Sequence, residues 1–186
     1  TARKLKSRSK TGSGQSRPIR ILFLSDNFPP EVNAPASRTF EHLRRWSSSG
    51  AEVTVITCAP NFPAGKVFDG YSNRWRSIEY QDGIRVVRVK SYITANSGFL
   101  TRTLDYISYM FSAIFFGLFE KRPDVIVGTS PQFFAALGAW MLSVFKRAPF
   151  VFELRDLWPA SIVTVGAMQE SPVIRFLEKL ELFLYR

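Results

Sequence analysis

The sequence has very little cysteine and histidine. Cys58 and His42 are the single residues of their types among 186. One cysteine permits no disulfide within the chain and no cysteine cluster that could bind zinc. A Ser-His-Asp triad or a two-histidine metal site is almost excluded, because each would have to use His42 itself. We expect His42 to be a surface or packing residue and Cys58 to be a small buried residue at the end of a strand.

Long apolar runs and glycine-rich phosphate motifs are also absent. Two long stretches are apolar, residues 106–119 and 133–145, whereas a membrane-spanning helix needs about 20 apolar residues. We expect both stretches to be core helices, with contact at a membrane interface as the alternative. Neither G-x-G-x-x-G nor a Walker A motif occurs, so the sequence supports neither dinucleotide binding nor a P-loop.

Acidic residues are missing from the start of the chain. The net charge is +10. Residues 1–20 hold seven basic and no acidic side chains, so residues 21–186 have a net charge of only +3. Residues 1–18 have almost nothing apolar to bury, so we expect a disordered basic tail, and no signal-peptide core follows it. Because the body is nearly neutral, nucleic acid is not the favoured partner. The tail is either a solvated extension or an electrostatic anchor to anionic lipid.

Short apolar segments alternate with helical patterns along the remaining sequence. This alternation predicts an α/β fold: a Rossmann-like, doubly wound, mainly parallel sheet covered on both faces. The last helical stripe reaches Arg186 without a cap, so we expect the natural chain to continue. The expected strands are 19–25, 52–57, 77–80, 84–89, 124–128 and 149–154, with a turn at 81–83, and the expected helices are 36–48, 100–119, 131–145 and one beginning at Pro172.

Four loops follow the expected parallel strands, and ligands bind outside the carboxyl ends of such strands. They are residues 26–36, 59–66, 129–132 and 155–159. The first loop runs into a helix N-terminus, whose free N–H groups suit phosphate; alternatively it only connects the two elements. Glu153, Arg155 and Asp156 follow a buried strand, where charges are costly unless paired or exposed in a cleft. They form either a structural salt bridge or a cleft carboxylate with its partners.

Several of these segments contain short motifs that, in this order along the chain, match those of a known family. They resemble the N-terminal domain of bacterial glycosyltransferase family 4 enzymes with the GT-B fold, in the subgroup that builds capsule, O-antigen or colanic-acid-like polysaccharides. The resemblance covers residues 19–186. The motifs that carry it are Phe28-Pro29-Pro30-Glu31 with Ala34-Pro35-Ala36-Ser37-Arg38, Pro60-Asn61-Phe62-Pro63, Gly83-Ile84-Arg85, Arg122-Pro123-Asp124, Thr129-Ser130-Pro131 and Glu153-Leu154-Arg155-Asp156-Leu157-Trp158-Pro159.

The resemblance implies a retaining transfer of a sugar from a nucleotide donor, usually UDP-linked, to an acceptor. In this subgroup the acceptor is often a lipid-linked saccharide, on undecaprenyl diphosphate, at the inner face of the cytoplasmic membrane. The chain would be the acceptor-side half of the enzyme and inactive alone, because the donor-binding domain with its paired glutamates is absent from this sequence. No metal and no other cofactor is expected.

The resemblance also implies roles for individual residues. Asp156 would orient an acceptor or donor hydroxyl in the cleft, supported by Glu153 and Arg155. The cleft would further be lined by Ser130 and by residues of the first loop, namely Glu31, Asn33, Ala34 and Pro35. The family commonly has glycine at the position of Asn33, where an asparagine side chain would crowd a close approach of phosphate. Two alternatives stay open: a non-catalytic Rossmann-like module that binds lipid or a partner, and a fragment of a GT-B-fold sugar-nucleotide epimerase.

Overall fold

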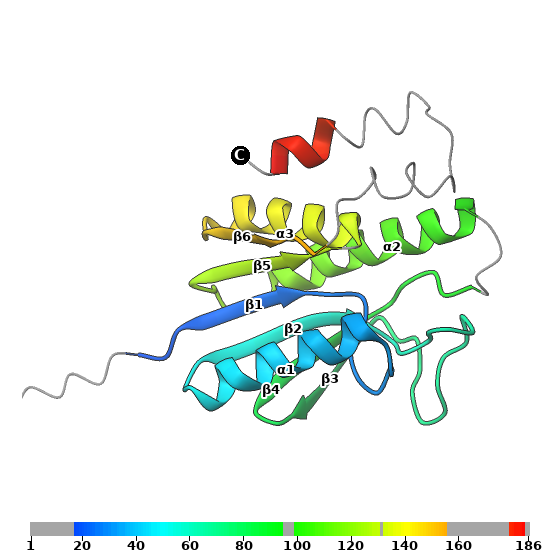
Figure 1. The fold of residues 1–186 in the computed structure, drawn as a ribbon, viewed down its shortest axis with the longest axis horizontal. Helices are drawn as coiled ribbons and strands as arrows, with labels where there is room; N and C mark the ends of the chain where they lie inside the picture. Colours follow the sequence, from blue (N-terminus) through cyan, green and yellow to red (C-terminus); the bar gives the residue numbers. More distant parts are fainter. Residues whose placement is uncertain (1–16, 95–98, 131, 156–178, 185–186) are drawn as a thin grey trace, which may run out of the picture.

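A six-stranded sheet forms the centre of the molecule (Figure 1). The computed structural model describes residues 17–94, 99–130, 132–155 and 179–184. The strand order is β3-β4-β2-β1-β5-β6. Only the edge strand β3 is antiparallel to its neighbour, which confirms the predicted mainly parallel fold. The elements are β1 (Arg20–Leu24), α1 (Ala34–Ser48), β2 (Glu52–Cys58), β3 (Arg76–Gln81), β4 (Ile84–Val89), α2 (Phe99–Leu118), β5 (Val125–Thr129), α3 (Phe133–Lys146) and β6 (Phe150–Glu153).

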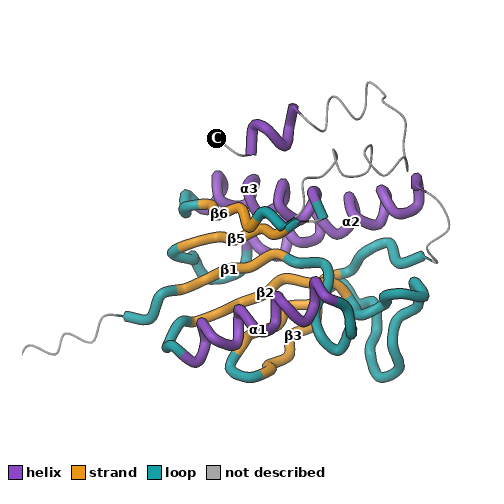
Figure 2. The backbone as a smooth tube through the Cα atoms, in the orientation of Figure 1, coloured by secondary structure: helices purple, strands orange, loops and turns teal. Residues whose placement is uncertain are grey.

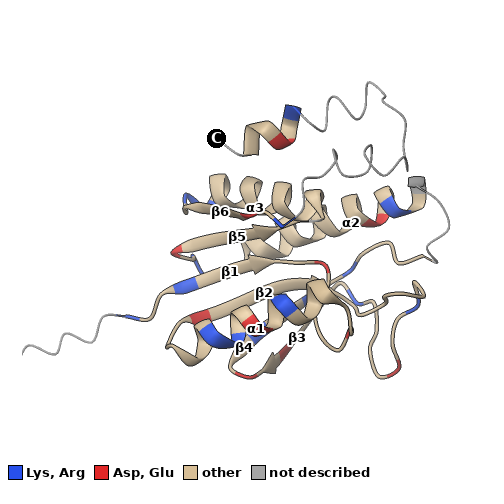
Figure 3. Cartoon of the chain, viewed as in Figure 1, with Lys and Arg blue, Asp and Glu red and all other residues tan. Residues whose placement is uncertain are grey.

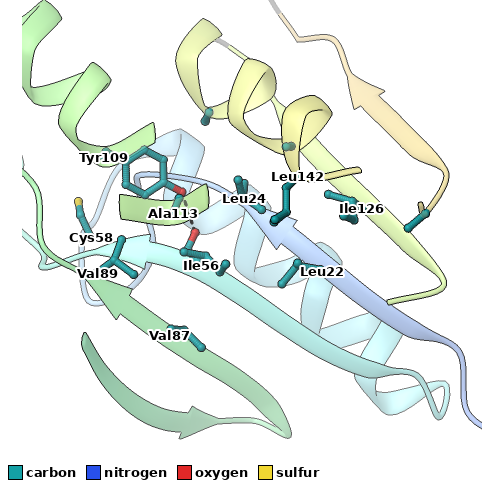
Figure 4. Close-up of a cluster of buried hydrophobic side chains, with 13 residues drawn as sticks. Leu22, Leu24, Ile56, Cys58, Val87, Val89, Tyr109, Ala113, Ile126 and Leu142 are labelled. Carbon is teal, nitrogen blue, oxygen red and sulfur yellow. Dashed lines mark hydrogen bonds between the residues drawn. The ribbon is translucent and has the colours of Figure 1, made fainter. Parts of the chain in front are cut away.

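Helices cover both faces of the sheet, as the continuous apolar strands predict. The α1 side of the core holds Phe23 and Leu43. The opposite side holds Leu22 and Leu24 under α2 and α3 (Figure 4). Among the described helices, none combines the length and apolar content needed to cross a bilayer. Tyr109 of α2 is buried there, and its hydroxyl donates a hydrogen bond to the Ile56 carbonyl at 2.8 Å. Alternate residues of the central strand therefore fill two separate cores, which fixes the register of the sheet.

Glycine residues allow α3 to pack closely against both β5 and α2. A Cβ on Gly128 would lie 2.8 Å from the Ala136 Cα, and one on Gly138 would lie 3.1 Å from the Met110 Cγ. The backbone of α3 thus packs directly on β5, because no side chain stands between them. The alanine and glycine content of this helix matches that close approach.

The turn between β3 and β4 confirms the predicted hairpin. Asp82 and Gly83 both have positive φ, at 48° and 77°, the combination that a two-residue type I′ turn requires. Gln81 pairs directly with Ile84. The hairpin places β3 at the edge of the sheet, where an antiparallel strand ends the parallel run.

Two helices begin at other residues than predicted, and two predicted segments lie partly outside the described residues. Helix α1 begins at Ala34 and α3 at Phe133, each two residues from the predicted start. Of the helix predicted from Pro172, residues 179–184 are described; Leu184 packs on α3 and Phe183 contacts Trp140 at 5.1 Å between ring centres. Residues 1–16 of the predicted tail lie outside the described part, whereas Arg17 pairs with Asp124, with its Nη1 3.2 Å from Oδ2.

Candidate functional site

The strand order creates a crevice beside β1, because the chain leaves β1 toward β2 on one side and returns to it through β5 on the other. Ligands of open α/β sheets bind at such a switch point, outside the carboxyl ends of the strands. A cleft of about 200 Å³ lies at this edge, lined by the loops after β1 and β2, by α2 and by the residue that precedes α3. Figure 2 shows the loops that follow β1 and β2 at the same edge of the sheet.

Glu31 joins two of the predicted site loops. Its side chain is buried, with 3% of the residue exposed, and Oε1 accepts hydrogen bonds from the backbone N–H groups of Asn61 and Phe62 at 2.7 and 2.9 Å. The other oxygen, Oε2, is buried and makes no hydrogen bond with the described residues. Burial raises the pKa of the Glu31 carboxyl, against the lowering effects of the two N–H groups, of the neighbouring Asn33 side chain and of the Arg88 charge. Glu31 therefore holds the cleft wall with one oxygen and leaves a second acceptor for a ligand.

Gln132 supplies a second buried acceptor. It lies in the expected site loop 129–132, although the sequence did not single it out. It precedes α3, is 7% exposed and lines the cleft. Its side chain does not cap the helix, and Oε1 makes no hydrogen bond with the described part of the chain. Leaving a buried polar atom unpaired costs about 1–3 kcal/mol, so this amide favours a ligand that donates a hydrogen bond.

Two aspartates line the same cleft, Asp26 from the loop after β1 and Asp105 from α2. Burial raises the pKa of Asp26 to about 7, with smaller raising effects from the charges of Glu31 and Asp105 and an opposing hydrogen bond from Asn27. Burial likewise raises the pKa of Asp105 to about 6, against a hydrogen bond with Ser91. Both carboxyls therefore change charge near neutral pH, where a group can accept or donate a proton to a substrate hydroxyl.

Asn33 uses its side chain to cap α1. Its Oδ1 accepts a hydrogen bond from the Ala36 N–H at 2.8 Å, and its Nδ2 donates to Asn27 Oδ1 at 2.9 Å. The backbone is extended, with φ −135°, so the position does not need the conformational freedom of glycine. The cap occupies one of the N–H groups that a phosphate would use. Ala34 and Pro35 form the first turn, and Pro35 lines the cleft together with Asn33.

Ser130 and Arg155 bring the ends of β5 and β6 together. The Arg155 backbone N–H donates to the Ser130 Oγ at 2.6 Å, and the Ser130 N–H donates to the Glu153 carbonyl at 3.1 Å. The Nε and Nη1 of Arg155 are buried and make no hydrogen bond within the described ranges. Asp156, the predicted catalytic residue, lies outside the described residues.

Glu153 points to α1 and not to the cleft described above. Its Oε1 lies 3.2 Å from Nη2 of Arg38 and 3.3 Å from Nδ1 of His42. This ion pair fastens β6 to α1. The two alternatives for the Arg155-Asp156 pair stay open, because Asp156 lies outside the described residues. His42 also contacts Trp46, with ring centres 6.2 Å apart, as expected for a packing residue.

Cys58 is a buried residue at the end of β2, as predicted, with 6% of its surface exposed. Burial raises the pKa of its thiol well above the usual range, which disfavours a reactive thiolate. Within the described residues, no group of three or more His, Cys, Asp and Glu side chains is arranged to hold a metal ion. The cleft lining combines three carboxyls and several amides with aromatic side chains such as Phe62 and Tyr106, and Arg102 is its one lining cation. Polar groups beside aromatic rings suit hydroxyl-rich ligands.

The raised pKa of Asp26 predicts a pH-dependent stability. An unfolded aspartate titrates near pH 3.8, and the folded one near pH 7. Between these values the folded state holds a proton that the unfolded state lacks, so stability falls as pH rises from about 4 to 7. Asp26→Asn should reduce this slope, to which Asp105 and Glu31 also contribute, and stabilise the domain by up to about 4 kcal/mol at pH 8, since one pKa unit corresponds to about 1.4 kcal/mol. Urea unfolding at pH 5 and pH 8 measures the change in the free energy of unfolding between these pH values. Asp69→Asn, at an exposed aspartate, is the control. An equal change in Asp26→Asn and the parent would contradict the expectation.

Comparison with known proteins agrees with the predicted fold. Residues 33–186 match the family described as "Glycosyl transferase 4-like domain". The chain is also 30% identical, over 150 residues, to WcaI of Escherichia coli (strain K12), a protein named for glycosyl transfer in colanic acid biosynthesis. That match covers 80% of this chain and 37% of WcaI, so the chain spans little more than a third of its relative. The family match over most of the sequence, on a mainly parallel α/β sheet, shows that this chain belongs to the glycosyl transferase 4-like family.

Proposed function

We propose that the chain is the acceptor-side half of a retaining glycosyltransferase. The whole enzyme transfers a sugar from a nucleotide-sugar donor, UDP-linked, to a lipid-linked saccharide in the synthesis of a bacterial surface polysaccharide. Family membership supports glycosyl transfer, and the similarity to a colanic acid biosynthesis protein supports a polysaccharide product. The donor is held mainly by a second domain, so the chain alone is inactive.

One observation carries the acceptor assignment: the cleft offers buried hydrogen-bond acceptors that have no partner among the described residues, Glu31 Oε2 and Gln132 Oε1. The hydroxyls of a saccharide are donors that would satisfy both. A diphosphate carries only acceptors and negative charge, and here it would meet the carboxyls of Asp26, Glu31 and Asp105. These acceptors support a neutral sugar in the cleft, and we propose that the donor diphosphate binds elsewhere.

The catalytic assignment rests on Asp156. As a carboxylate after β6 it would orient the reacting hydroxyl, with Arg155 beside it and with Ser130 fixing the Arg155 backbone. No metal takes part in this proposal. In the protein that contains this chain together with its donor domain, Asp156→Ala should lower turnover about tenfold, the cost of one charge-assisted hydrogen bond. Asp69→Ala, an exposed substitution of the same type, is the matched control.

The test of the function is transfer from a panel of radiolabelled UDP-sugars to a lipid-linked saccharide by the full-length protein, with the anomeric configuration of the product read by NMR. Retention is the expected outcome. The isolated 186-residue chain should bind a soluble acceptor analogue without transferring sugar. Transfer by the isolated chain at the full rate would disprove the half-enzyme assignment. Turnover of the donor without acceptor would indicate an epimerase, and neither binding nor turnover would indicate an interaction module.

A further inference from the structure

Arg88 is a buried charge inside the parallel part of the sheet. In β1 and β2 the charged residue is the first of the strand (Figure 3), β5 has none, and the charge of β6 is its last residue. Strand β4 differs, because Arg85 and Arg88 stand between its apolar residues. The Arg85 side chain is 26% exposed, whereas Arg88 is only 3% exposed. A buried charge is costly unless it is paired and hydrogen-bonded, so Arg88 requires partners.

The position of Arg88 in β4 directs its side chain toward the α1 side of the sheet. Ile84 and Val86 pack in the core on that side, and Arg88 is the next residue of the same row, because alternate residues of a strand share a face. This core also holds Phe28, from the loop after β1. Strand β4 runs parallel to β2, so Arg88 lies near the carboxyl end of the sheet, where the cleft is.

The Arg88 guanidinium donates hydrogen bonds to both loops that build the cleft. Its Nη2 donates to the Pro29 carbonyl at 2.6 Å, in the loop after β1. Its Nη1 donates to the Cys58 carbonyl at 3.0 Å, where the loop after β2 begins. The Nε donates to Oε1 of Glu79, on β3, at 2.8 Å, and the Cζ lies 4.9 Å from the ring centre of Tyr71, farther along the loop after β2. One side chain therefore fastens two loops and the neighbouring strand.

The two loops that Arg88 holds carry residues of the cleft wall. Pro29 lies two residues before Glu31, whose Oε1 accepts the N–H groups of Asn61 and Phe62 at 2.7 and 2.9 Å. Arg88 is not itself among the described residues that line the cleft. Burial raises the pKa of the Glu31 carboxyl, and the Arg88 charge is one of the effects that lower it. Arg88 therefore reaches the cleft through the backbone of the loops and through its charge.

We propose that Arg88 is a positioning residue of the cleft: it holds the loops after β1 and β2 together so that Glu31 binds both N–H groups with one oxygen and offers the other to the acceptor sugar. The part that concerns the acceptor rests on the proposed function, whereas the holding of the loops does not. A guanidinium has five donors in a fixed fork, so it can hold two carbonyls and a carboxylate at once. A lysine ammonium keeps the charge but lacks the fork, which makes Arg88→Lys the informative substitution.

Hydrogen exchange of the 186-residue chain, followed by NMR, tests the holding of the loops without any sugar transfer. Arg88→Lys should speed the exchange of the Asn61 and Phe62 amides about tenfold, since one hydrogen bond to a charged group accounts for a change of that size. The amides of β1 and β5 should exchange as in the parent, because the opening is local. Arg88→Met, which removes the charge as well, should speed the same two amides at least as much. Arg85→Lys is the matched control on the same strand and should exchange like the parent, since Arg85 pairs with Glu120 at 3.4 Å on the opposite face.

Parent-like exchange of the Asn61 and Phe62 amides in both Arg88 variants would overturn the positioning role. An equal acceleration in β1 and β5 would also overturn it, because Arg88 would then only stabilise the whole domain.

Steady-state kinetics of the full-length enzyme test the part that concerns the acceptor. Arg88→Lys should raise KM for the acceptor about tenfold and leave kcat near that of the parent, since an interaction common to the ground state and the transition state is lost. KM for the donor should not change, and Arg85→Lys should have parent kinetics. A loss of folded enzyme alone would lower the rate without moving the acceptor KM. Faster local exchange with an unchanged acceptor KM would support the holding of the loops and overturn the assignment of the acceptor to this cleft.

Discussion

Replacing Glu31 by glutamine is expected to lower kcat/KM for the acceptor about 100-fold in the full-length enzyme, while the domain stays folded. Glutamine keeps the volume and keeps an Oε1 that accepts the N–H groups of Asn61 and Phe62. The second oxygen becomes an N–H₂ donor, so a sugar hydroxyl loses its acceptor and faces a donor. A hydrogen bond to a charged group contributes about 1.5–3 kcal/mol, which corresponds to about 10- to 150-fold in rate.

The measurement is initial-rate kinetics with varied acceptor at saturating donor, accompanied by thermal unfolding. Glu41→Gln is the matched control, because Glu41 is a surface residue of α1 that pairs with Arg44 at 2.8 Å. Its kinetics should equal those of the parent. A Glu31→Gln enzyme with normal kcat/KM for the acceptor would show that Oε2 does not face the sugar.

Replacing Gly128 by alanine is expected to destabilise the domain by about 3 kcal/mol, at the upper end of what overpacking a core costs. The new Cβ would lie 2.8 Å from both the Ala136 Cα and the Ala139 Cβ. Neither atom is the mobile end of a side chain, so β5 and α3 would have to separate. Equilibrium urea unfolding, followed by circular dichroism, measures the loss.

Gly117→Ala is the matched control for this prediction. There the nearest atom is the Leu142 Cδ2 at 2.6 Å, the end of a side chain that can change rotamer, and alanine favours the helix by about 1 kcal/mol relative to glycine. We expect a change smaller than 1 kcal/mol at this site. Equal losses in the two variants would mean that backbone contact at Gly128 does not limit the packing.

The sequence was sufficient for the architecture because its signals are local. Runs such as 52–57 and 124–128 are short, apolar and rich in valine and isoleucine, and Asp82-Gly83 specifies its turn through backbone geometry alone. The helix starts were less exact, since Asn33 and Gln132 both precede their helices and only Asn33 forms a side-chain cap. A side-chain cap depends on the rotamer of one residue, and the pattern of apolar residues does not predict that rotamer.

The site was predictable only where loops follow strands in the chain. Glu31, Asn33 and Pro35 line the cleft as the first loop predicted. Asp105 was missed because it looks like an ordinary polar residue within a helix. Gln132 lies in the expected loop 129–132 but was not singled out, because an amide before a helix is an ordinary polar residue. Their position in the cleft depends on how α2 and α3 cross the sheet. Conversely, Glu153 is the last residue of β6, at the edge where site residues lie, yet its side chain pairs with α1 because strand residues alternate between faces.

The central position of β1 has a consequence for how the protein is made. Its partner on one side, β5, comes about a hundred residues later, and the contact from the Arg20 N–H to Asp124 spans 104 positions. At a synthesis rate of about 5–20 residues per second, roughly 5–20 seconds separate the emergence of these strands from the ribosome. During that time one edge of an apolar strand has no neighbour to pair with. The order of the strands therefore leaves one edge of β1 unpaired in the nascent chain until β5 arrives.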